Sequence, residues 1–126
     1  RTPPPKPAAQ RAAPSKPPLL PFDETIRQAR LFYKKKRYRE AAALYRKLIR
    51  QYPRRYEPYG ELGNIYYKLR RYEEAAKLYY EAAVRLQAAG LAAKAWRLQK
   101  AMERFAPRYA RRLKQKLSSS LKKGRT

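Results

Sequence analysis

The sequence predicts an all-α fold built from antiparallel pairs of helices, and three observations point to it. Apolar residues recur at helical spacing from residue 22 to about residue 117. Gly and Pro interrupt this pattern at Pro53, Pro58, Gly90 and Pro107, which leaves about six helical segments. The chain also repeats itself at an offset of 34 residues, a period typical of stacked helix pairs.

The internal repeat is the strongest of these observations. Nine positions in a window of thirteen residues are identical between the two copies. The first copy contributes Tyr33, Lys34, Arg37, Tyr38, Glu40, Ala41, Ala42, Leu44 and Tyr45, which recur as Tyr67, Lys68, Arg71, Tyr72, Glu74, Ala75, Ala76, Leu78 and Tyr79. Such a match indicates a duplicated structural unit that stacks on its neighbour to bury a continuous core.

The second copy shows why each unit forms two helices. Its first half carries apolar residues at i, i+3, i+4 and i+7 spacing from Tyr59 to Tyr66, and its second half repeats this spacing from Ala75 onward. A Gly inside a helix costs about 1 kcal/mol relative to Ala. Gly63 is therefore expected where the two helix backbones approach most closely, with Ala75 as the small residue on the other helix.

The first 21 residues differ in composition from the rest of the chain. They contain eight Pro, four basic residues and no acid, which predicts a disordered or extended arm of polyproline type. Asp23 follows and is expected to be the N-cap of the first helix, with Glu24 in its first turn. A basic arm of this kind fits an extracytoplasmic or envelope location after a removed signal or an anchor, and it equally fits an organellar matrix.

Residues 90–117 predict a third helix pair that departs from the repeat. Its first helix carries an apolar stripe from Leu91 to Phe105, and Pro107 suits the start of the second helix, whose apolar edge ends at Leu117. The aromatic residues that close the first two units are missing here. The pair is therefore expected to be an atypical terminal unit that covers the end of the stack.

The second copy resembles the tetratricopeptide repeat in the segment LGNIYYKLRRYEEAAKLYYEAA, which has a similar order of Leu-Gly, Tyr-Tyr, Glu-Ala and a final aromatic residue with Ala. Residues 56–89 match this pattern well. Residues 22–55 match it in their second half, whereas Gln28, Ala29 and Phe32 replace the usual residues of the first helix. The resemblance implies a short right-handed α-solenoid of two repeats, with the third pair as a degenerate cap.

The resemblance also implies a binding surface. In this family the inner face, lined by the first helix of each pair, usually binds an extended peptide or the surface of another protein. Carried over to this chain, the inner face comprises Arg30, Tyr33, Lys34, Asn64, Tyr67, Lys68 and Lys94. Lys and Arg suit carboxylates or phosphates, Asn offers a donor and an acceptor to a peptide backbone, and Tyr adds contact area with a polar tip.

The charge of the chain indicates an anionic partner. There are 33 Lys and Arg against nine Asp and Glu, a formal net charge of +24 that repels itself in the compact state. The segment from Arg104 to Thr126 holds nine of these basic residues and no acid, and its last part, 118–126, is expected to be a disordered basic tail. The predicted last helix supplies candidate anion- or phosphate-binding residues: Arg108, Arg111, Arg112, Lys114 and Lys116.

Two functions fit these patterns. The first is a non-enzymatic adaptor or assembly subunit that binds an acidic protein or peptide within a larger complex, and the resemblance favours it. The alternative is a structural component of a ribonucleoprotein, such as an organellar ribosome, that contacts the RNA phosphate backbone. The spread of positive charge over every segment favours this alternative, although the sequence contains no aromatic motif for reading RNA bases.

Missing residue types exclude several classes of chemistry. The chain has no Cys and no His, which excludes disulfides, thiol catalysis and acid–base catalysis by imidazole. The carboxylates form no convergent group, so no enzyme activity, metal, cofactor or small-molecule substrate is expected. Glu40 and Glu74 are interpreted as partners of Arg37 and Arg71 near the turns. No stretch approaches 18 apolar residues, so nothing in the given chain is predicted to span a bilayer.

Overall fold

The computed structural model describes residues 19–125, with side chains as far as residue 120. Most of the predicted N-terminal arm, at residues 1–18, lies outside this range. Within it the chain forms six α-helices and no strands: α2 (Phe22–Lys34), α3 (Tyr38–Gln51), α4 (Tyr56–Lys68), α5 (Tyr72–Ala88), α6 (Ala92–Met102) and α7 (Pro107–Arg125). The all-α prediction is confirmed, and so is Pro107 as the first residue of the last helix.

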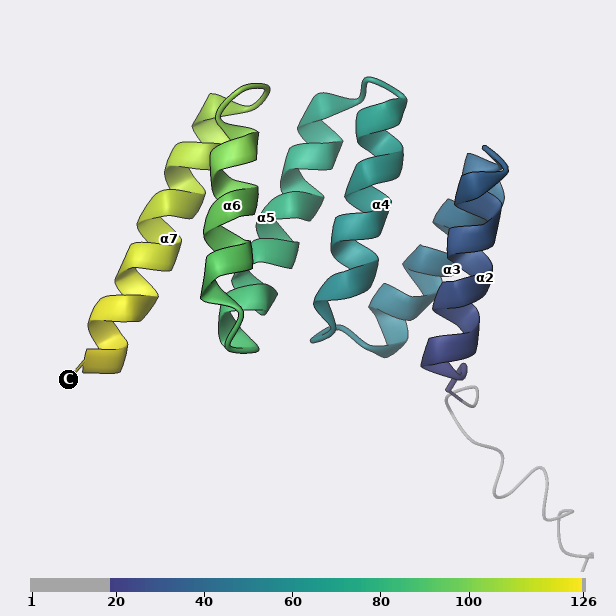
Figure 1. Ribbon diagram of the computed structural model, residues 1–126, viewed down its shortest axis with the longest axis horizontal. Coiled ribbons are helices and arrows are strands. Elements are labelled where there is room, and N and C mark those ends of the chain that lie inside the picture. The colour runs from purple at the N-terminus through teal and green to yellow at the C-terminus, as the bar shows by residue number, and fades with distance from the viewer. Residues whose placement is uncertain (1–18, 126) are drawn as a thin grey trace, which may run out of the picture.

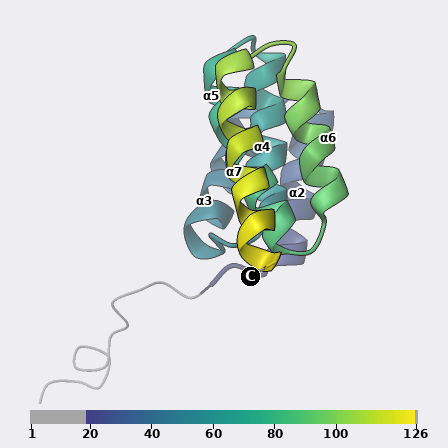
Figure 2. The ribbon, with the colours of Figure 1, turned by 90° about the vertical axis from the view of Figure 1, so that its left-hand side faces the viewer.

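The helices form three antiparallel pairs that stack side by side (Figure 1). Each helix packs on the next one along the chain, and α7 also packs on α5. In the view of Figure 2, α3, α5 and α7 form one layer, and α2, α4 and α6 form the other. We call the surface made by α2, α4 and α6 the inner face, as in the prediction.

Two apolar clusters hold the stack together. The first joins α2 and α3 to α4 and comprises Phe22, Ile26, Ala29, Ala41, Ala42, Tyr45, Leu48, Leu62 and Ile65. The second joins α5 to α6 and α7 and comprises Ala75, Ala76, Tyr79, Ala83, Leu86, Ala95, Met102, Ala110, Leu113 and Leu117. Since α4 and α5 pack on each other between these clusters, the core runs through all three pairs.

The predicted close approach inside the second pair is present. Gly63 of α4 faces the ring of Tyr79 on α5, and a Cβ atom at Gly63 would lie only 2.8 Å from Tyr79 Cε1. Ala29 occupies the matching place in the first pair and is completely buried, as are Ala41 and Ala75. The small residues thus allow the backbones of each pair to pack with large aromatic rings beside them.

The turns that end α2, α4 and α5 share one geometry. The second residue after the end of each helix adopts the left-handed region: Lys36 with φ 62°, Arg70 with φ 60° and Gly90 with φ 85°. The N–H of the following residue then donates to a carbonyl five residues earlier, as from Leu91 to Leu86 at 2.8 Å. This is the Schellman motif, which satisfies the last carbonyls of a helix. The left-handed conformation of Lys36 and Arg70 is unusual for residues other than Gly.

Two details differ from the sequence predictions. Asp23 is not an N-cap, because α2 already begins at Phe22 after Pro21, and Asp23 lies in its first turn. The backbone of α7 continues to Arg125, past the boundary predicted at 117, since no Gly or Pro interrupts it before Gly124.

Candidate functional site

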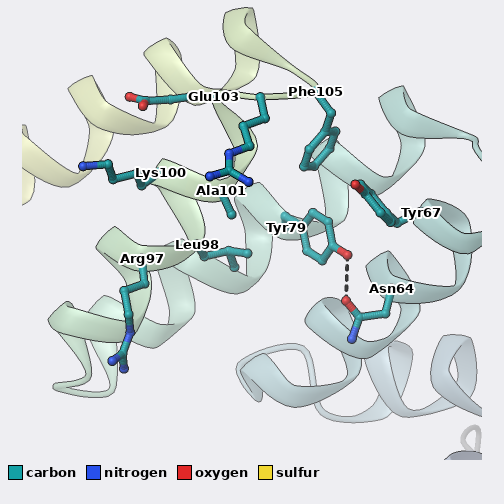
Figure 3. A pocket seen from close by; sticks show the side chains of 10 residues that line it. Asn64, Tyr67, Tyr79, Arg97, Leu98, Lys100, Ala101, Glu103 and Phe105 are labelled. Atoms are coloured by element: carbon teal, nitrogen blue, oxygen red, sulfur yellow. Dashed lines mark hydrogen bonds between the residues drawn. The ribbon is translucent and has the colours of Figure 1, made fainter.

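The inner face carries a groove of about 840 Å³ between the second and third helix pairs. Side chains of α6 line one wall, side chains of α4 line the other, and Tyr79 of α5 lies between them (Figure 3). The lining residues are Asn64, Tyr67, Tyr79, Arg97, Leu98, Lys100, Ala101, Glu103, Arg104 and Phe105. The groove is open to solvent along its length, which suits an extended ligand rather than a small molecule.

An aromatic cluster forms one end of this groove. Phe105, from the turn between α6 and α7, inserts among tyrosines of the second repeat, with its ring centroid 5.1 Å from that of Tyr67 and 5.9 Å from that of Tyr79. Tyr67 also stacks edge-on against Tyr72 at 5.2 Å. Tyr67 remains 43% exposed, so the cluster offers a fixed apolar surface with a polar tip.

The floor of the groove is polar. The Tyr79 hydroxyl donates a hydrogen bond to Asn64 Oδ1 at 2.6 Å. Burial raises the pKa of Tyr79, so this hydroxyl stays protonated and remains the donor at neutral pH. This hydrogen bond fixes the orientation of the Asn64 amide and engages its oxygen atom. Its NH₂ group makes no hydrogen bond within the described chain and can donate to a ligand carbonyl or carboxylate.

Cations dominate the α6 wall. Arg97, Lys100 and Arg104 line it, and the one acid beside them is Glu103, which accepts a hydrogen bond from Gln99 at 3.3 Å. None of the three cations belongs to the five ion pairs found among the described residues. The wall therefore presents uncompensated positive charge to the groove.

The junction between the first two pairs provides a contrast. There Arg30 of α2 makes two hydrogen bonds to Glu61 of α4, at 2.7 and 2.6 Å, and the Tyr45 hydroxyl donates to the same carboxylate at 2.8 Å. The hydrogen bond to Glu61 raises the pKa of Arg30, while burial raises that of Tyr45. The positive charge of Arg30 is thus neutralised within the chain.

The two junctions differ at one equivalent position. Glu61 lies five residues after Tyr56, the first residue of α4, and Arg97 lies five residues after Ala92, the first residue of α6. A carboxylate that faces the preceding pair in one junction is therefore replaced by a guanidinium in the next. The groove lacks the internal counter-charge that closes the first junction.

The family profile of the tetratricopeptide repeat matches residues 26–90, which is 65 of the 126 residues. The chain belongs to the tetratricopeptide repeat family. Members of this family typically serve as non-catalytic scaffolds that bind other proteins, so this chain has a protein-interaction or scaffold role. A search of curated proteins finds no match.

The profile ends just before the third helix pair of this tetratricopeptide repeat protein. The cationic wall of the groove, on α6, thus lies outside the matched residues. The described part of the chain contains no helix with the length and hydropathy needed to cross a membrane. It also contains no group of three or more Asp and Glu side chains placed to hold a metal ion.

Only part of the predicted inner-face set lies in the groove. Asn64 and Tyr67 line it, whereas the exposed side chains of Lys34, Lys68 and Lys94 do not. The other two predicted residues are engaged inside the repeat protein: Arg30 by Glu61, and Tyr33 by Tyr38, with ring centroids 5.5 Å apart. Burial also raises the pKa of Tyr33.

The groove-lining residues that sequence reasoning missed include Arg97, Lys100, Arg104 and Phe105. The reason is a shift in register. In this repeat protein α4 begins 34 residues after α2, at Tyr56 against Phe22, but α6 begins 36 residues after α4, at Ala92. The period of 34 residues therefore does not continue into α6, where Lys94 is the one residue that the predicted inner face includes. The Gly90 turn was the available signal, because it marks where the period changes.

The second predicted set lies on another surface. Arg108, Arg111, Arg112, Lys114 and Lys116 are all exposed on α7, as the narrow apolar edge of this helix suggested. The predicted partners of Arg37 and Arg71 are confirmed, because these residues pair with Glu40 at 2.6 Å and Glu74 at 2.5 Å. These two ion pairs repeat with the structural unit and stay near the turns.

Proposed function

We propose that this protein is a non-enzymatic adaptor that binds an acidic segment of a partner protein in the groove between α4 and α6. The observation that carries the proposal is the exchange of Glu61 for Arg97 at equivalent positions of successive helix pairs. In the first junction Glu61 pairs with Arg30, whereas in the second the one carboxylate of the lining, Glu103, pairs with none of the three cations. A carboxylate supplied by a partner would complete the second junction as Glu61 completes the first.

The groove offers distinct contacts to each part of such a segment. Guanidinium groups of Arg97 and Arg104 can bind carboxylates in a bidentate manner, as Arg30 binds Glu61. The Asn64 amide can donate to a peptide carbonyl, and this fixes the direction of the bound chain. Tyr67 offers apolar area at the aromatic end, where a Leu or aromatic side chain of the partner would bury its surface.

The combination of aromatic and cationic side chains favours a protein ligand in this groove. Charged groups at an exposed rim mainly set specificity and the association rate, whereas buried aromatic anchors supply most of the affinity. The groove has both within one site, because Tyr67 and Phe105 lie beside the cations of α6. A partner segment in which acidic residues flank an apolar residue matches this arrangement, with carboxylates against the cations and the apolar side chain against the aromatic rings.

Binding of acidic peptides by the full chain tests the proposal. The probe is a library of short peptides with acidic residues around one Leu, Phe or Trp, and the same peptides with Gln and Asn in place of the acids serve as neutral counterparts. We expect the acidic peptides to bind more tightly, measured by fluorescence anisotropy. The double variant R97E/R104E should weaken the tightest of them by about tenfold or more, since it reverses the charge of two groove residues.

A matched control separates groove binding from general attraction to a basic protein. The variant R27E/R50E makes the same change in charge at two exposed residues of α2 and α3, far from the groove. It should leave peptide affinity within about twofold of the wild type at physiological salt, because exposed charges outside the groove lining are largely screened by salt. Equal losses in the two variants, or equal binding of acidic and neutral peptides, would contradict the proposal.

A further inference from the structure

The last helix, α7, leaves one side uncovered by the rest of the described chain. Its apolar edge, formed by Ala110, Leu113 and Leu117, is at most 1% exposed and packs into the cluster shared with α5 and α6. Because α7 ends the row of helices, its other side faces away from the stack (Figure 1). The exposed cations of α7 are Arg108, Arg111, Arg112, Lys114 and Lys116, and none of them lines the groove between α4 and α6.

The cations of this surface repel one another. Arg108 lies three residues before Arg111 and four before Arg112, and Arg112 lies four before Lys116. Like charges at these spacings are neighbours on a helix and destabilise it by about 0.2–0.5 kcal/mol per pair. The helix α7 contains no Asp or Glu, and none of its described cations joins an ion pair. An external polyanion would relieve this repulsion.

The chemistry of the surface favours nucleic acid over an acidic protein. The exposed large apolar side chains of the described chain are Leu19, Leu31, Tyr67, Leu69 and Tyr72, and none lies on α7. A stable protein interface needs a buried apolar or aromatic anchor. Interfaces with nucleic acid are more polar and much more positively charged, so a surface of cations alone matches them better.

An anionic membrane matches the surface less well. A helix that lies in a membrane interface inserts its apolar face among the acyl chains. The apolar edge of α7 is already buried against α5 and α6, as the exposure of at most 1% at Leu113 shows. Only charge–charge attraction to lipid headgroups is left, without the apolar insertion that distinguishes membrane-surface helices.

The surface also lacks a platform for stacking bases. Tyr109 is the aromatic residue of α7, and it is half-buried, with its hydroxyl 3.4 Å from Glu73 Oε1 and the Arg112 guanidinium carbon 5.4 Å from its ring centroid. Single-stranded nucleic acids are usually bound by stacking on exposed aromatic rings. A duplex needs no such platform, because its backbone presents phosphates at high density.

We propose that the outer side of α7, formed by Arg108, Arg111 and Arg112 with Lys114 and Lys116 beside them, binds the phosphate backbone of double-stranded RNA without reading its sequence. Because one side of α7 is buried, the helix would contact the phosphates on both sides of a nucleic-acid groove. It would not enter that groove as the recognition helix of a DNA-binding protein does. The narrow major groove of A-form RNA brings phosphates of its two strands close together, within reach of one row of Arg side chains. The protein would thus hold an acidic protein in the groove and RNA on α7.

The salt dependence of RNA binding by the full chain tests this inference. The ridge variant R108Q/R111Q/R112Q and the control variant R27Q/K47Q/R50Q each remove three exposed positive charges, from opposite ends of the stack. Binding to a duplex RNA hairpin is measured over a series of salt concentrations. Each phosphate contact contributes about 0.9 to the slope of log K against log salt for a duplex. We expect the ridge variant to lower the slope by about 2–3 and the control to lower it by less than about 1.

Measurements of folding, and of binding to other anionic ligands, complete the test. Helical content and thermal melting should be unchanged or improved in the ridge variant, since Gln removes the like-charge pairs and favours helices. A single-stranded RNA of the same length should bind more weakly than the hairpin, and a DNA duplex should also bind more weakly. The inference is overturned if the two variants lose RNA affinity equally, or if either other nucleic acid binds as tightly as duplex RNA. The inference is also overturned if binding of anionic phosphatidylserine vesicles depends on Arg108, Arg111 and Arg112 while binding of RNA does not.

Discussion

Two glycines of α4 are expected to respond in opposite ways to replacement by Ala. A Cβ atom at Gly63 would lie 2.8 Å from Tyr79 Cε1 and 2.9 Å from Tyr79 Cδ1, closer than carbon atoms approach without a shift. At Gly60 the nearest heavy atom would be Ala82 Cβ at 3.7 Å, an ordinary contact. Both residues lie within the same helix, so the gain in helix propensity on replacement of Gly by Ala is similar at the two positions.

The magnitudes follow from two opposing effects. Replacing Gly by Ala inside a helix gains about 1 kcal/mol. Overpacking a core costs about 1–3 kcal/mol when the neighbour cannot move away. The Tyr79 ring is held by its hydrogen bond to Asn64 and by its contact with Phe105, so it cannot yield easily. G60A should therefore stabilise the protein by about 1 kcal/mol, and G63A should be neutral or destabilise it by up to about 2 kcal/mol.

Urea unfolding followed by circular dichroism measures both free energies of unfolding on the full chain. The difference between the variants isolates the overpacking cost, since the gain in helix propensity is common to both. We expect a difference of about 1–3 kcal/mol, which corresponds to several degrees in Tm for a domain of this size. If G63A stabilises the protein as much as G60A does, then close packing against Tyr79 is not the reason for Gly63.

Three other predictions concern stability. Replacing Gly90, which has φ 85°, by Ala should destabilise the turn by about 1 kcal/mol in the same assay, whereas Asn should cost less; equal effects would contradict a left-handed turn. E61Q should lower the free energy of unfolding by about 1–2 kcal/mol, because Arg30 and Tyr45 both bond this carboxylate, and the R30Q/E61Q double variant should recover part of the loss. Burial raises the pKa values of Tyr45 and Tyr79 above the ordinary value of 10.0. The contribution of these two protonated hydroxyls to the free energy of unfolding is therefore complete below pH 10, and it is lost as the pH rises through the raised pKa values. Tyrosinate absorbance should therefore rise in two stages as the pH increases, and the second stage should coincide with unfolding. A single stage near pH 10 would contradict the expected late ionisation of the two buried tyrosines.

Local sequence patterns were enough to predict most of the fold. The period of 34 residues placed the first two pairs, and Pro107 marked the start of α7. Gly63 indicates the close approach inside the second pair, because a Gly inside a helix requires a packing reason. The turns were harder to predict, since Lys36 and Arg70 adopt the left-handed conformation without the Gly that usually marks it.

The candidate groove was less predictable. Asn64 and Tyr67 were found because they belong to the regular repeat, where family resemblance assigns the inner face directly. Phe105 was placed in the apolar stripe of the third pair, and its insertion among tyrosines of the second repeat depends on how the turn after α6 folds back. Such contacts between residues distant in sequence leave no periodic signal in the chain.

By itself, the sequence determined the all-α class, the duplicated unit, the basic cap and the exposed cations of α7, because each depends on composition or on spacing along one helix. Only the tertiary structure decided which charges of the inner face are available. Arg30 is predicted to face a ligand but pairs with Glu61, whereas Arg97 lines the groove because α6 begins two residues later than the repeat period predicts. The reason is physical: which side chains meet across a junction depends on the packing and register of neighbouring pairs, which the pattern within one helix does not contain.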